Sequence, residues 1–472
     1  MWDWEKFADN TAVLDDRECC LTYGELSEAC RELYAAIGRR CLVFSMCDNL
    51  MGSLVGYAAF LQNRVVPAML KRDLDEELLA ALYEDYRPAY IWLPEEDISK
   101  SAVYDGCRAV YRAFGYALLS TPYSEEAPLY PELALLLTTS GSTGSPKFVR
   151  QSYENIRANT DSIVEYLHLD SSERPITTLP MNYTYGLSIL NTHLDVGATI
   201  LLTDKSLMQR QFWDFFRAGE ATSFGGVPYT YEMLKRLRFF RMDLPSLRTM
   251  TQAGGRLLPE LHREFAEYAQ NTGREFVVMY GQCEATARMA WLPPARSLDK
   301  VGSMGVAIPG GRFELLDGDG AVVTEPQTTG ELVYFGKNVT LGYAACGADL
   351  ARGDENHGRL VTGDMAQMDT EGFYTIVGRK KRFLKIFGNR VNLDDAERLL
   401  KGAFGAEIVC GGKDDSLYIF TIDGARAEEM RGWLAEKTGL PKSAIRTVTI
   451  DAIPYNESGK IVYKALESYY NE

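Results

Sequence analysis

The sequence has no apolar run long enough to cross a membrane. Its most apolar stretch, residues 52–70, is interrupted by Gln62-Asn63-Arg64, whereas a membrane-spanning helix needs about 20 predominantly apolar residues. We therefore predict a buried helix and a buried strand in this stretch. Residues 1–6 lack the basic segment followed by an apolar segment that is typical of a signal peptide. We expect neither a membrane span nor export.

Positive charge is also scarce. The chain has 50 Lys and Arg residues against 65 Asp and Glu residues, which gives a net charge of −15. Sequence-independent binding to nucleic acids or to anionic membranes needs a basic surface. The composition therefore argues against both kinds of partner, although it permits a local basic groove for phosphates.

Patterns typical of metal sites and disulfides are missing as well. The four histidines are too far apart for a zinc-type spacing, so we expect each at the surface or hydrogen-bonded in the core. The nine cysteines show no C-x-x-C spacing. Scattered thiols of this kind predict a reducing, cytoplasmic location. The histidines are His168, His193, His262 and His357.

What the sequence does contain is an alternation of apolar and amphipathic segments. The 472 residues suggest two or three domains. Residues 21–37 have a helical period, and strand-like runs follow at 41–46, 89–93, 198–202 and 223–227. Strands that alternate with helices predict parallel βαβ units and an α/β fold.

The sequence pattern changes twice in the C-terminal third of the chain. Residues 310–323 and 330–343 are rich in Gly and Asp turns between alternating strands, which suggests a small antiparallel barrel or sheet. A basic cluster follows at 378–390, where a solvated linker is one interpretation. The last 80 or so residues predict a compact α+β piece with helices at 394–404 and 427–439 and a strand at 417–422.

The segment TTSGSTGSPKFVRQS, residues 138–152, directly follows the apolar run 135–137. Glycines and small hydroxyl residues leave backbone N–H groups open to an anion, and Lys147 adds a mobile positive charge that suits phosphate. A P-loop fails because Gly144 is followed by Ser-Pro-Lys instead of Gly-Lys-Ser/Thr. A flexible Ser/Gly linker is disfavoured because the segment follows a predicted buried strand.

This segment fits the pattern [ST]-[SG]-G-[ST]-[ST]-G-x-P-K and resembles the phosphate loop of the adenylate-forming enzymes. That superfamily includes acyl-CoA synthetases, adenylation domains of nonribosomal peptide synthetases and luciferases. Further family motifs occur in order, so that the resemblance covers roughly residues 20–465. It implies a large N-terminal domain of βαβ sheets with a small β-barrel-like subdomain, followed by a small, mobile α+β domain.

The resemblance assigns roles to residues of three further motifs. In MYGQCEATARM, residues 279–289, it implies that Tyr280 stacks on adenine and that Glu284 holds Mg²⁺; Cys283 stands where the family usually has Thr. In TQAGGRLL, residues 251–258, it implies a Gly-Gly turn beside the adenine and the acyl group. In residues 360–379, it implies that Asp364 and Arg379 contact the ribose. The nucleotide site implied in this way comprises Thr139, Ser140, Gly141, Ser142, Thr143, Gly144, Lys147, Gly254, Gly255, Arg256, Tyr280, Gly281, Gln282, Cys283, Asp364 and Arg379.

The C-terminal motifs imply domain movement. The basic cluster resembles the family's hinge, with Lys381 at the rotation point, and the loop at 387–391, which contains Gly388, resembles the wall of the thiol tunnel. Lys460, in PYNESGKIVYKAL, resembles the adenylation lysine. The implied division is a large domain 1–378, a hinge 379–381 and a small domain 382–472. Lys460, Glu284 and Lys147 are the implied catalytic residues.

The acid substrate is expected in a pocket formed by Tyr183, Tyr185, Gly226, Val227, Gly254 and Gly281. Two tyrosines in this set favour an aryl or medium-length acyl group, although simple packing of the tyrosines stays open. Peptide-synthetase relatives have an Asp near 184 for the substrate amino group, and Thr184 stands here. An amino-acid-activating enzyme that loads a carrier protein remains the alternative.

The expected reaction uses ATP and Mg²⁺ to convert an acid into an acyl adenylate with release of pyrophosphate. The acyl group then passes to a thiol, either that of CoA or that of the phosphopantetheine arm of a carrier protein. A hypothesis of a different class is a non-catalytic relative that only binds a nucleotide or an acyl ligand. Five residues argue against this hypothesis: Lys147, Glu284, Asp364, Arg379 and Lys460.

Overall fold

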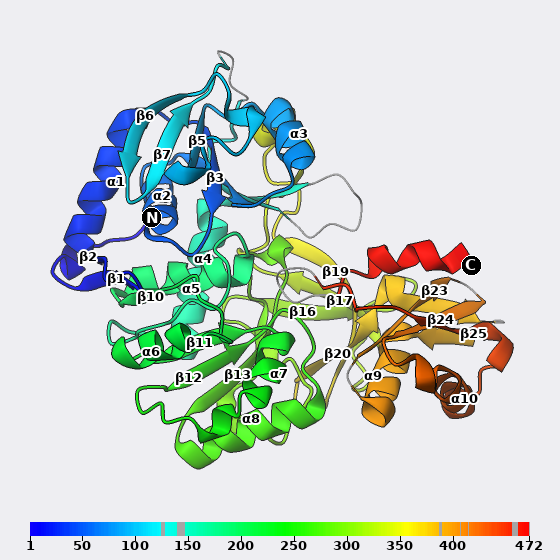
Figure 1. Cartoon of the computed structure of the whole chain (residues 1–472). Helices are drawn as coiled ribbons and strands as arrows, with labels where there is room; N and C mark the ends of the chain where they lie inside the picture. Colours follow the sequence, from blue (N-terminus) through cyan, green and yellow to red (C-terminus); the bar gives the residue numbers. More distant parts are fainter. Residues whose placement is uncertain are drawn as a thin grey trace. The chain divides into compact units, whose positions relative to one another are not determined.

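The structure is a computed structural model of the chain, and it describes residues 1–123, 128–138, 147–386, 389–405, 407–413, 415–455 and 461–471. The chain forms two compact units. The first contains residues 1–312 and 335–360, and the second contains residues 313–334 and 361–472. Each unit has its own sheets and its own core (Figure 1). This division of the chain does not show whether the predicted hinge at residues 379–381 rotates, so the hinge stays a prediction.

An eight-stranded sheet dominates the first unit. Its order is β18-β9-β8-β4-β3-β5-β7-β6. Strands β4, β3 and β5 are parallel neighbours, as the βαβ pattern predicts. In the same order the strands span Gly342–Ala344, Phe148–Ser152, Leu133–Thr138, Val66–Lys71, Leu42–Cys47, Tyr90–Pro94, Tyr116–Ser120 and Arg108–Ala113.

Both faces of this sheet are buried, and strand β3 shows why. Val43 and Cys47 belong to the core that contains α1 (Tyr23–Ile37) and α2 (Met51–Gln62). Phe44 and Met46 belong to the core on the other face, with α3 (Glu76–Tyr86). A strand covered on both faces is expected to be apolar throughout. Helix α2 is buried along almost its whole length, which confirms the buried helix predicted at the start of residues 52–70.

A second sheet of the first unit has the order β11-β12-β13-β14-β15, with parallel pairing among its first three strands. Helices α7 and α8 accompany it (Figure 1). A three-stranded sheet, β10-β1-β2, completes the unit. The strands of the two sheets span Ser223–Gly226, Thr249–Gln252, Glu275–Tyr280, Ala290–Trp291, Val306–Ala307, Ile200–Leu202, Thr11–Asp15 and Cys20–Thr22. The remaining helices are α4 Tyr153–Leu167, α5 Thr184–Val196, α6 Arg210–Ala218, α7 Pro228–Arg236 and α8 Pro259–Thr272.

The second unit corrects one expectation. The region predicted as barrel-like is a four-stranded sheet in the order β16-β17-β19-β20. Within the described residues β16 and β20 are its two edges, so the sheet is open. Only β19 and β20 are joined by a short connection, and they pair antiparallel. Its strands span Arg312–Leu316, Gly330–Phe335, Arg359–Met368 and Tyr374–Arg379.

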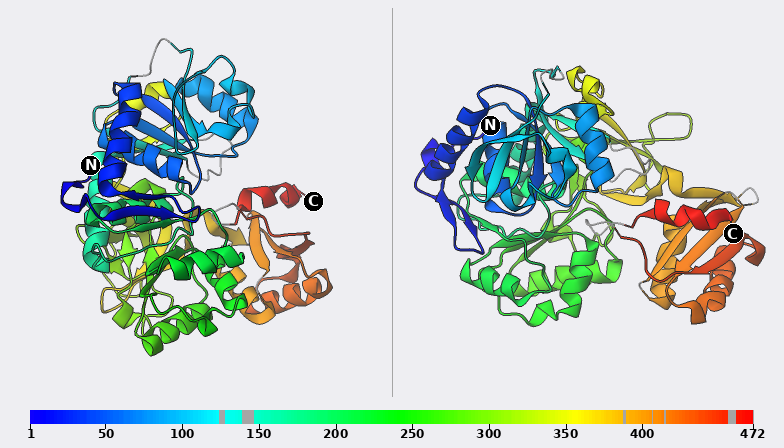
Figure 2. Two further views of the ribbon diagram at one scale, coloured as in Figure 1. Left: turned by 60° about the vertical axis from the view of Figure 1, so that its left-hand side comes forward. Right: turned by 45° about the horizontal axis from the view of Figure 1, so that its top comes forward.

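The rest of the second unit matches the predicted α+β piece (Figure 2). Helices α9 (Leu393–Phe404) and α10 (Ala427–Thr438) share an apolar core with the sheet β23-β24-β25. The strands of that sheet and of the hairpin before it span Ile408–Lys413, Ser416–Thr421 and Ile445–Thr449, and β21 Phe383–Ile386 and β22 Asn389–Asn392. No helix in the described part of the chain is both long and apolar enough to cross a membrane.

Candidate active site

The predicted phosphate loop connects two paired strands. β8 ends at Thr138 and β9 begins at Phe148, and these two residues are opposite each other in an antiparallel ladder. Lys147 is exposed immediately before β9. The hairpin therefore fixes both ends of the loop. Thr139, Ser140, Gly141, Ser142, Thr143 and Gly144 themselves lie outside the described residues.

Strand β9 is anchored by a buried arginine. The side chain of Arg150 is fully buried; its Nε donates to the Tyr343 carbonyl at 3.1 Å and its Nη2 donates to the Leu341 carbonyl at 3.0 Å. Its charge is offset by Glu355. These contacts hold β18 beside β9, so that Tyr343 pairs with Val149.

Glu284 lies in a short 3₁₀ turn after strand β13, and β18 contacts it directly. The Tyr343 hydroxyl donates to Glu284 Oε1 at 2.6 Å, and the Thr340 backbone N–H donates to the Glu284 carbonyl at 3.0 Å. Partial burial, followed by the charge of Glu284, raises the pKa of Tyr343 above its ordinary value. The phenol therefore stays a hydrogen-bond donor, and it connects the Glu284 carboxylate to β18, the neighbour of the strand that follows Lys147.

The turn after Glu284 has an unusual backbone. Thr286 and Ala287 both have positive φ, at 50° and 88°, a region that non-glycine residues seldom adopt. Gly281 makes this possible, because a Cβ there would lie 1.5 Å from the Ala287 carbonyl oxygen. Strain of this kind persists only where the surroundings enforce it. Here the Asn338 side chain donates to the carbonyls on both sides of the turn, those of Ala285 and Arg288.

The predicted pocket residues come together around the edge of the second sheet. The Tyr185 hydroxyl lies 2.8 Å from Thr251 Oγ1, and its ring lies 6.3 Å from that of Tyr183. Gly226 ends β11, and Val227 is the buried N-cap residue of α7. The Gly254-Gly255 turn follows β12, and Gly254 has a φ of 83° that favours glycine.

The remaining nucleotide residues of the first unit lie at the ends of β12 and β13. Tyr280 is half-buried and accepts a hydrogen bond from Gln282 at 3.2 Å. Cys283 and Gly281 are also half-buried, and Arg256 is exposed. The carboxyl ends of neighbouring parallel strands meet at one edge of a sheet, where ligands of α/β proteins commonly bind.

In the second unit, Asp364 and Arg379 contact each other. They are paired across β19 and β20, and Arg379 Nε lies 3.1 Å from Asp364 Oδ1. Lys380 and Arg382 also have acidic partners, at Glu331 and Asp394. The described basic residues Arg379, Lys380 and Arg382 therefore belong to regular structure and have acidic partners, which argues against an unstructured linker at these three positions.

Three further predicted residues have no described side chain. Lys381 is part of the 3₁₀ turn Lys380–Arg382, but only its backbone is described. Gly388 and Lys460 lie outside the described residues. Their roles stay predictions.

Comparisons with known proteins decide the family. The profile of the AMP-binding enzyme family matches residues 2–344. The chain belongs to the AMP-binding enzyme family. An indoleacetate–CoA ligase of Aromatoleum aromaticum is 30% identical over 355 residues, which cover 70% of this chain and 66% of that protein. An L-proline–carrier-protein ligase of Pseudomonas fluorescens is 28% identical over 349 residues, covering 70% and 67%.

Solved structures agree with this AMP-binding fold. The AMP complex of the O-succinylbenzoate–CoA synthetase MenE of Bacillus subtilis has a TM-score of 0.79 at 21% identity and covers 98% of this chain and 96% of that one. ATP-bound MatB of Rhodopseudomonas palustris has a TM-score of 0.79 at 20% identity and covers 100% and 97%. The family profile confirms the predicted superfamily, the solved structures confirm its fold, and the named relatives are acid–thiol ligases.

Sequence reasoning missed three residues of this AMP-binding enzyme. Arg150 anchors β9, Tyr343 contacts Glu284, and Arg288 lies four residues beyond Glu284. Tyr343 could not be found, because its contact joins segments 59 residues apart. Arg288 did leave a signal: it is a charged residue in the otherwise apolar run of residues 287–292.

His193, on helix α5, is predicted to make the folding stability of the enzyme fall at acidic pH. Burial lowers the pKa of His193 to about 4, and the nearby charge of Arg288 contributes in the same direction. In the unfolded chain, the His193 side chain takes up a proton near pH 6.5. The stability that comes from burying neutral His193 is therefore complete above that pH and is lost as the pH falls towards 4. We expect a slope of up to about 1.4 kcal/mol per pH unit in this window.

Denaturant unfolding at pH 5 and pH 7 measures this slope in the wild type and in His193→Gln. The variant should show a smaller difference between the two pH values. His357→Gln, at an exposed histidine with 81% of its side chain accessible, is the matched control. An unchanged difference in His193→Gln would contradict the assignment. His262, whose pKa is also lowered to about 4 by burial, contributes a second slope that both variants retain.

Proposed function

We propose that this chain activates a carboxylic acid with Mg-ATP and transfers the acyl group to a thiol. The observation that carries the proposal is the link between Glu284 and the phosphate loop. Tyr343 joins the Glu284 carboxylate to β18, which pairs with β9, and β9 directly follows Lys147. The proposed metal-binding carboxylate and the strand that follows the proposed phosphate loop are thus connected through β18 within the first unit.

The chemistry needs these groups for a simple reason. A free carboxylate does not react with thiols, because its leaving group would be oxide or hydroxide. Attack by the carboxylate on the α-phosphorus of ATP forms an acyl adenylate and releases pyrophosphate. A thiol then displaces AMP from the acyl carbon. The first step brings two anions together, and positive charge from Lys147, Lys460 and the metal offsets their repulsion.

The residues fit a magnesium ion shared with the nucleotide. Mg²⁺ prefers oxygen ligands and commonly uses one or two carboxylates together with phosphates and waters. Glu284 supplies one such carboxylate, and no cluster of three potential ligands occurs among the described residues. Solved relatives of the same fold include MenE in complex with ATP and magnesium. Bound magnesium would neutralise phosphate charge and align the triphosphate.

The acceptor is a thiol of CoA or of a carrier protein. Curated relatives include CoA ligases and a ligase that acts on a carrier protein. We propose CoA as the first acceptor to test, because most of the named relatives are CoA ligases. The amino-acid-activating alternative is weaker, because Thr184 offers no carboxylate to a substrate amino group.

The proposed acid has an aryl or medium-length acyl group. Tyr183 and Tyr185 form an edge-to-face pair, and the Tyr185 hydroxyl would lie 3.0 Å from a Cβ on Gly225, the neighbour of Gly226. Aromatic walls of this kind suit flat or extended apolar groups. Named relatives act on indoleacetate and ferulate, among other acids.

ATP–pyrophosphate exchange with a panel of carboxylic acids tests the proposal. An adenylate-forming ligase exchanges label only in the presence of its acid, and adding CoA or a phosphopantetheinylated carrier then identifies the acceptor. A protein that binds ATP but supports no exchange with any acid would belong to the non-catalytic class instead. Isothermal titration with ATP distinguishes that class from an inactive preparation.

Tyr343→Phe should raise the Mg²⁺ requirement. Losing a hydrogen bond to a charged group costs about 1.4 kcal/mol, which corresponds to a tenfold higher Mg²⁺ concentration for half-maximal exchange. Tyr111→Phe is the matched control, since its hydroxyl contacts Glu32 at 3.3 Å. Equal Mg²⁺ requirements in the two variants would show that Tyr343 does not position the metal ligand.

A further inference from the structure

The two buried arginines of the described residues differ in their partners. In the part of the chain that the structure describes, Arg150 and Arg288 are the buried arginines, at 0% and 2% exposure. Arg150 forms an ion pair with Glu355 and donates to several carbonyls. This arrangement follows the general rule that a buried charge is paired and fully hydrogen-bonded.

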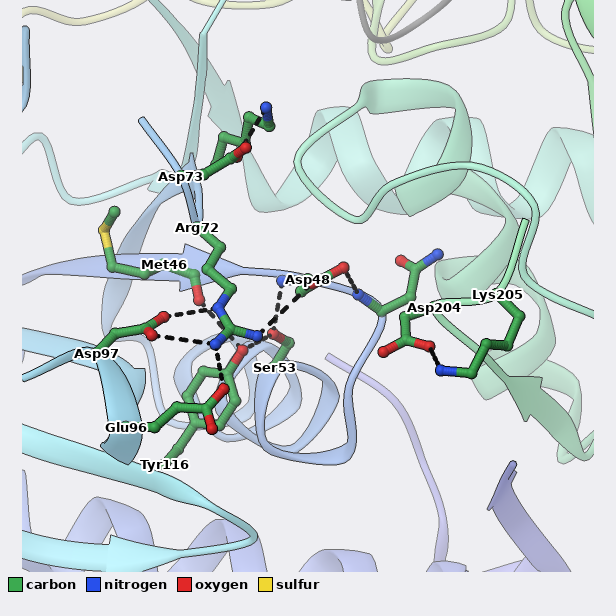
Figure 3. Close-up of polar contacts among 12 residues, drawn as sticks. Met46, Asp48, Ser53, Arg72, Asp73, Glu96, Asp97, Tyr116, Asp204 and Lys205 are labelled. Atoms are coloured by element: carbon green, nitrogen blue, oxygen red, sulfur yellow. Dashed lines mark hydrogen bonds and ion pairs between the residues drawn. The ribbon is translucent and has the colours of Figure 1, made fainter. Parts of the chain in front are cut away.

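A less buried arginine follows the same rule. Figure 3 shows Arg72 between Asp97, Glu96 and Asp48, with the Asp97 carboxylate facing the guanidinium group. Hydrogen bonds to Asp97 are the main cause of the raised pKa of Arg72. Its positive charge is compensated within the protein.

Arg288 departs from this rule. Its Nη1 lies 3.2 Å from the Tyr166 hydroxyl and also contacts the Met279 sulfur, which is a poor acceptor. The ring of Tyr185 lies 4.5 Å from the guanidinium carbon. Its Nε is buried without a hydrogen-bond partner, and no carboxylate forms an ion pair with it among the described residues.

Among the described residues, the groups that contact Arg288 supply no negative charge. Burial raises the pKa of Tyr185 to about 12, and it also raises the pKa values of Tyr166 and Tyr183. His193 is likewise uncharged at neutral pH, because its pKa is lowered to about 4. A full positive charge is therefore buried here against neutral side chains. An uncompensated buried charge is costly to folding, and such costs are typical of functional sites.

The position of Arg288 places this charge at the acyl pocket. Its guanidinium is stacked against Tyr185 and acts on the titration of Tyr183, which are the two tyrosines of the predicted pocket. The strained turn at Thr286 and Ala287 separates it from Glu284, so that the carboxylate and the guanidinium are presented by opposite ends of one short segment.

We propose that Arg288 binds a second carboxylate on the acid substrate. On the function proposed above, one carboxylate of the substrate reacts with ATP, and the other pairs with the guanidinium at the far end of the pocket. The substrate class is thereby narrowed to acids that carry two anionic groups joined by a short or aromatic spacer.

Matched pairs of acids test the proposal on the wild-type enzyme. The probes are succinate, glutarate, adipate and 4-carboxyphenylacetate, each beside its monomethyl ester. We expect at least one diacid to support pyrophosphate exchange with a kcat/KM on the order of 100-fold above that of its monoester. Monoesters or plain monoacids that outperform every diacid would overturn the proposal.

Substitution of Arg288 should weaken the preference for diacids over their monoesters without unfolding the protein. Arg288→Met should lower kcat/KM for the preferred diacid on the order of 100-fold, mainly through KM, and leave the monoester unaffected or improved. Arg288→Lys keeps the charge and should retain part of the preference. The thermal midpoint of ligand-free Arg288→Met should equal or exceed that of the wild type, because an unpaired buried charge is removed.

Arg72→Met is the control, since it deletes a partly buried arginine that does have acidic partners. It should lower the thermal midpoint and leave acid preference unchanged. A large fall in the midpoint of Arg288→Met, with equal losses for diacid and monoester, would assign Arg288 a structural role and overturn the proposal.

Thermal shift separates this proposal from the proposed ligase function. In the presence of AMP, the preferred diacid should raise the midpoint of the wild type more than that of Arg288→Met. That shift without any pyrophosphate exchange would refute the ligase function and support the anion site. Pyrophosphate exchange with monoacids only would support the ligase function and refute the anion site at Arg288.

Discussion

Replacing Lys460 with alanine is expected to reduce acyl-adenylate formation by roughly two to three orders of magnitude. Formation of the thioester from supplied acyl-AMP should be largely unaffected. The physical reason is the charge of the two half-reactions. In the first, an anionic carboxylate attacks a triphosphate, and a lysine offsets the negative charge that accumulates. In the second, pyrophosphate has gone, and a thiol attacks a carbonyl carbon.

Pyrophosphate exchange measures the first half-reaction, and release of AMP from synthetic acyl-AMP with CoA measures the second. Lys464→Ala is the matched control, because Lys464 is an exposed lysine four residues further along the chain. It should leave both rates near those of the wild type. Normal exchange in Lys460→Ala, or equal loss of both half-reactions, would refute the assignment of Lys460.

The substitution Gly281→Ala should cause the second large loss of pyrophosphate exchange activity. A Cβ at this position would lie 1.5 Å from the Ala287 carbonyl oxygen and 3.0 Å from the Arg288 Cα. Since these are backbone atoms, no side-chain rotation can relieve the clash, and the turn that carries Glu284 must move. We expect exchange activity to fall at least 100-fold, because small displacements of catalytic groups have such effects, and stability to fall by about 2–3 kcal/mol.

Gly402→Ala provides the control for this prediction. Gly402 lies in helix α9, and no atom comes within 4 Å of a Cβ placed there. The same chemical change should therefore leave activity intact and raise stability by about 0.5–1 kcal/mol. Wild-type exchange activity in Gly281→Ala would show that the turn can relax without disturbing the site.

Much of the fold could be predicted because local patterns decided it. The helical period of residues 21–37 and the apolar, strand-like run at 417–422 correspond to helix α1 and strand β24. The open sheet β16-β17-β19-β20 was misjudged as barrel-like, because whether edge strands meet depends on twist and on non-local pairing. Strand composition does not encode that outcome.

The site could be predicted only where a motif is continuous in sequence. The run at 279–289 contained Tyr280 and Glu284 because their spacing is a local feature. The hydroxyl of Tyr343 reaches Glu284 only because Arg150 holds β18 beside β9. The proposed role of Arg288 is harder still to predict, because it depends on the absence of a nearby carboxylate among the described residues, which only three-dimensional placement reveals.

The hydrogen bonds that hold residue 288 suggest a use for this enzyme as an engineering scaffold. Asn159 and Asn338 both donate to the backbone carbonyl of Arg288, at 2.9 Å each, and not to its side chain. The backbone is therefore fixed whatever side chain stands there. Saturation mutagenesis at this single codon should yield mostly folded proteins with altered acid selectivity, whereas equal diversification at Gly281 should yield mostly inactive ones.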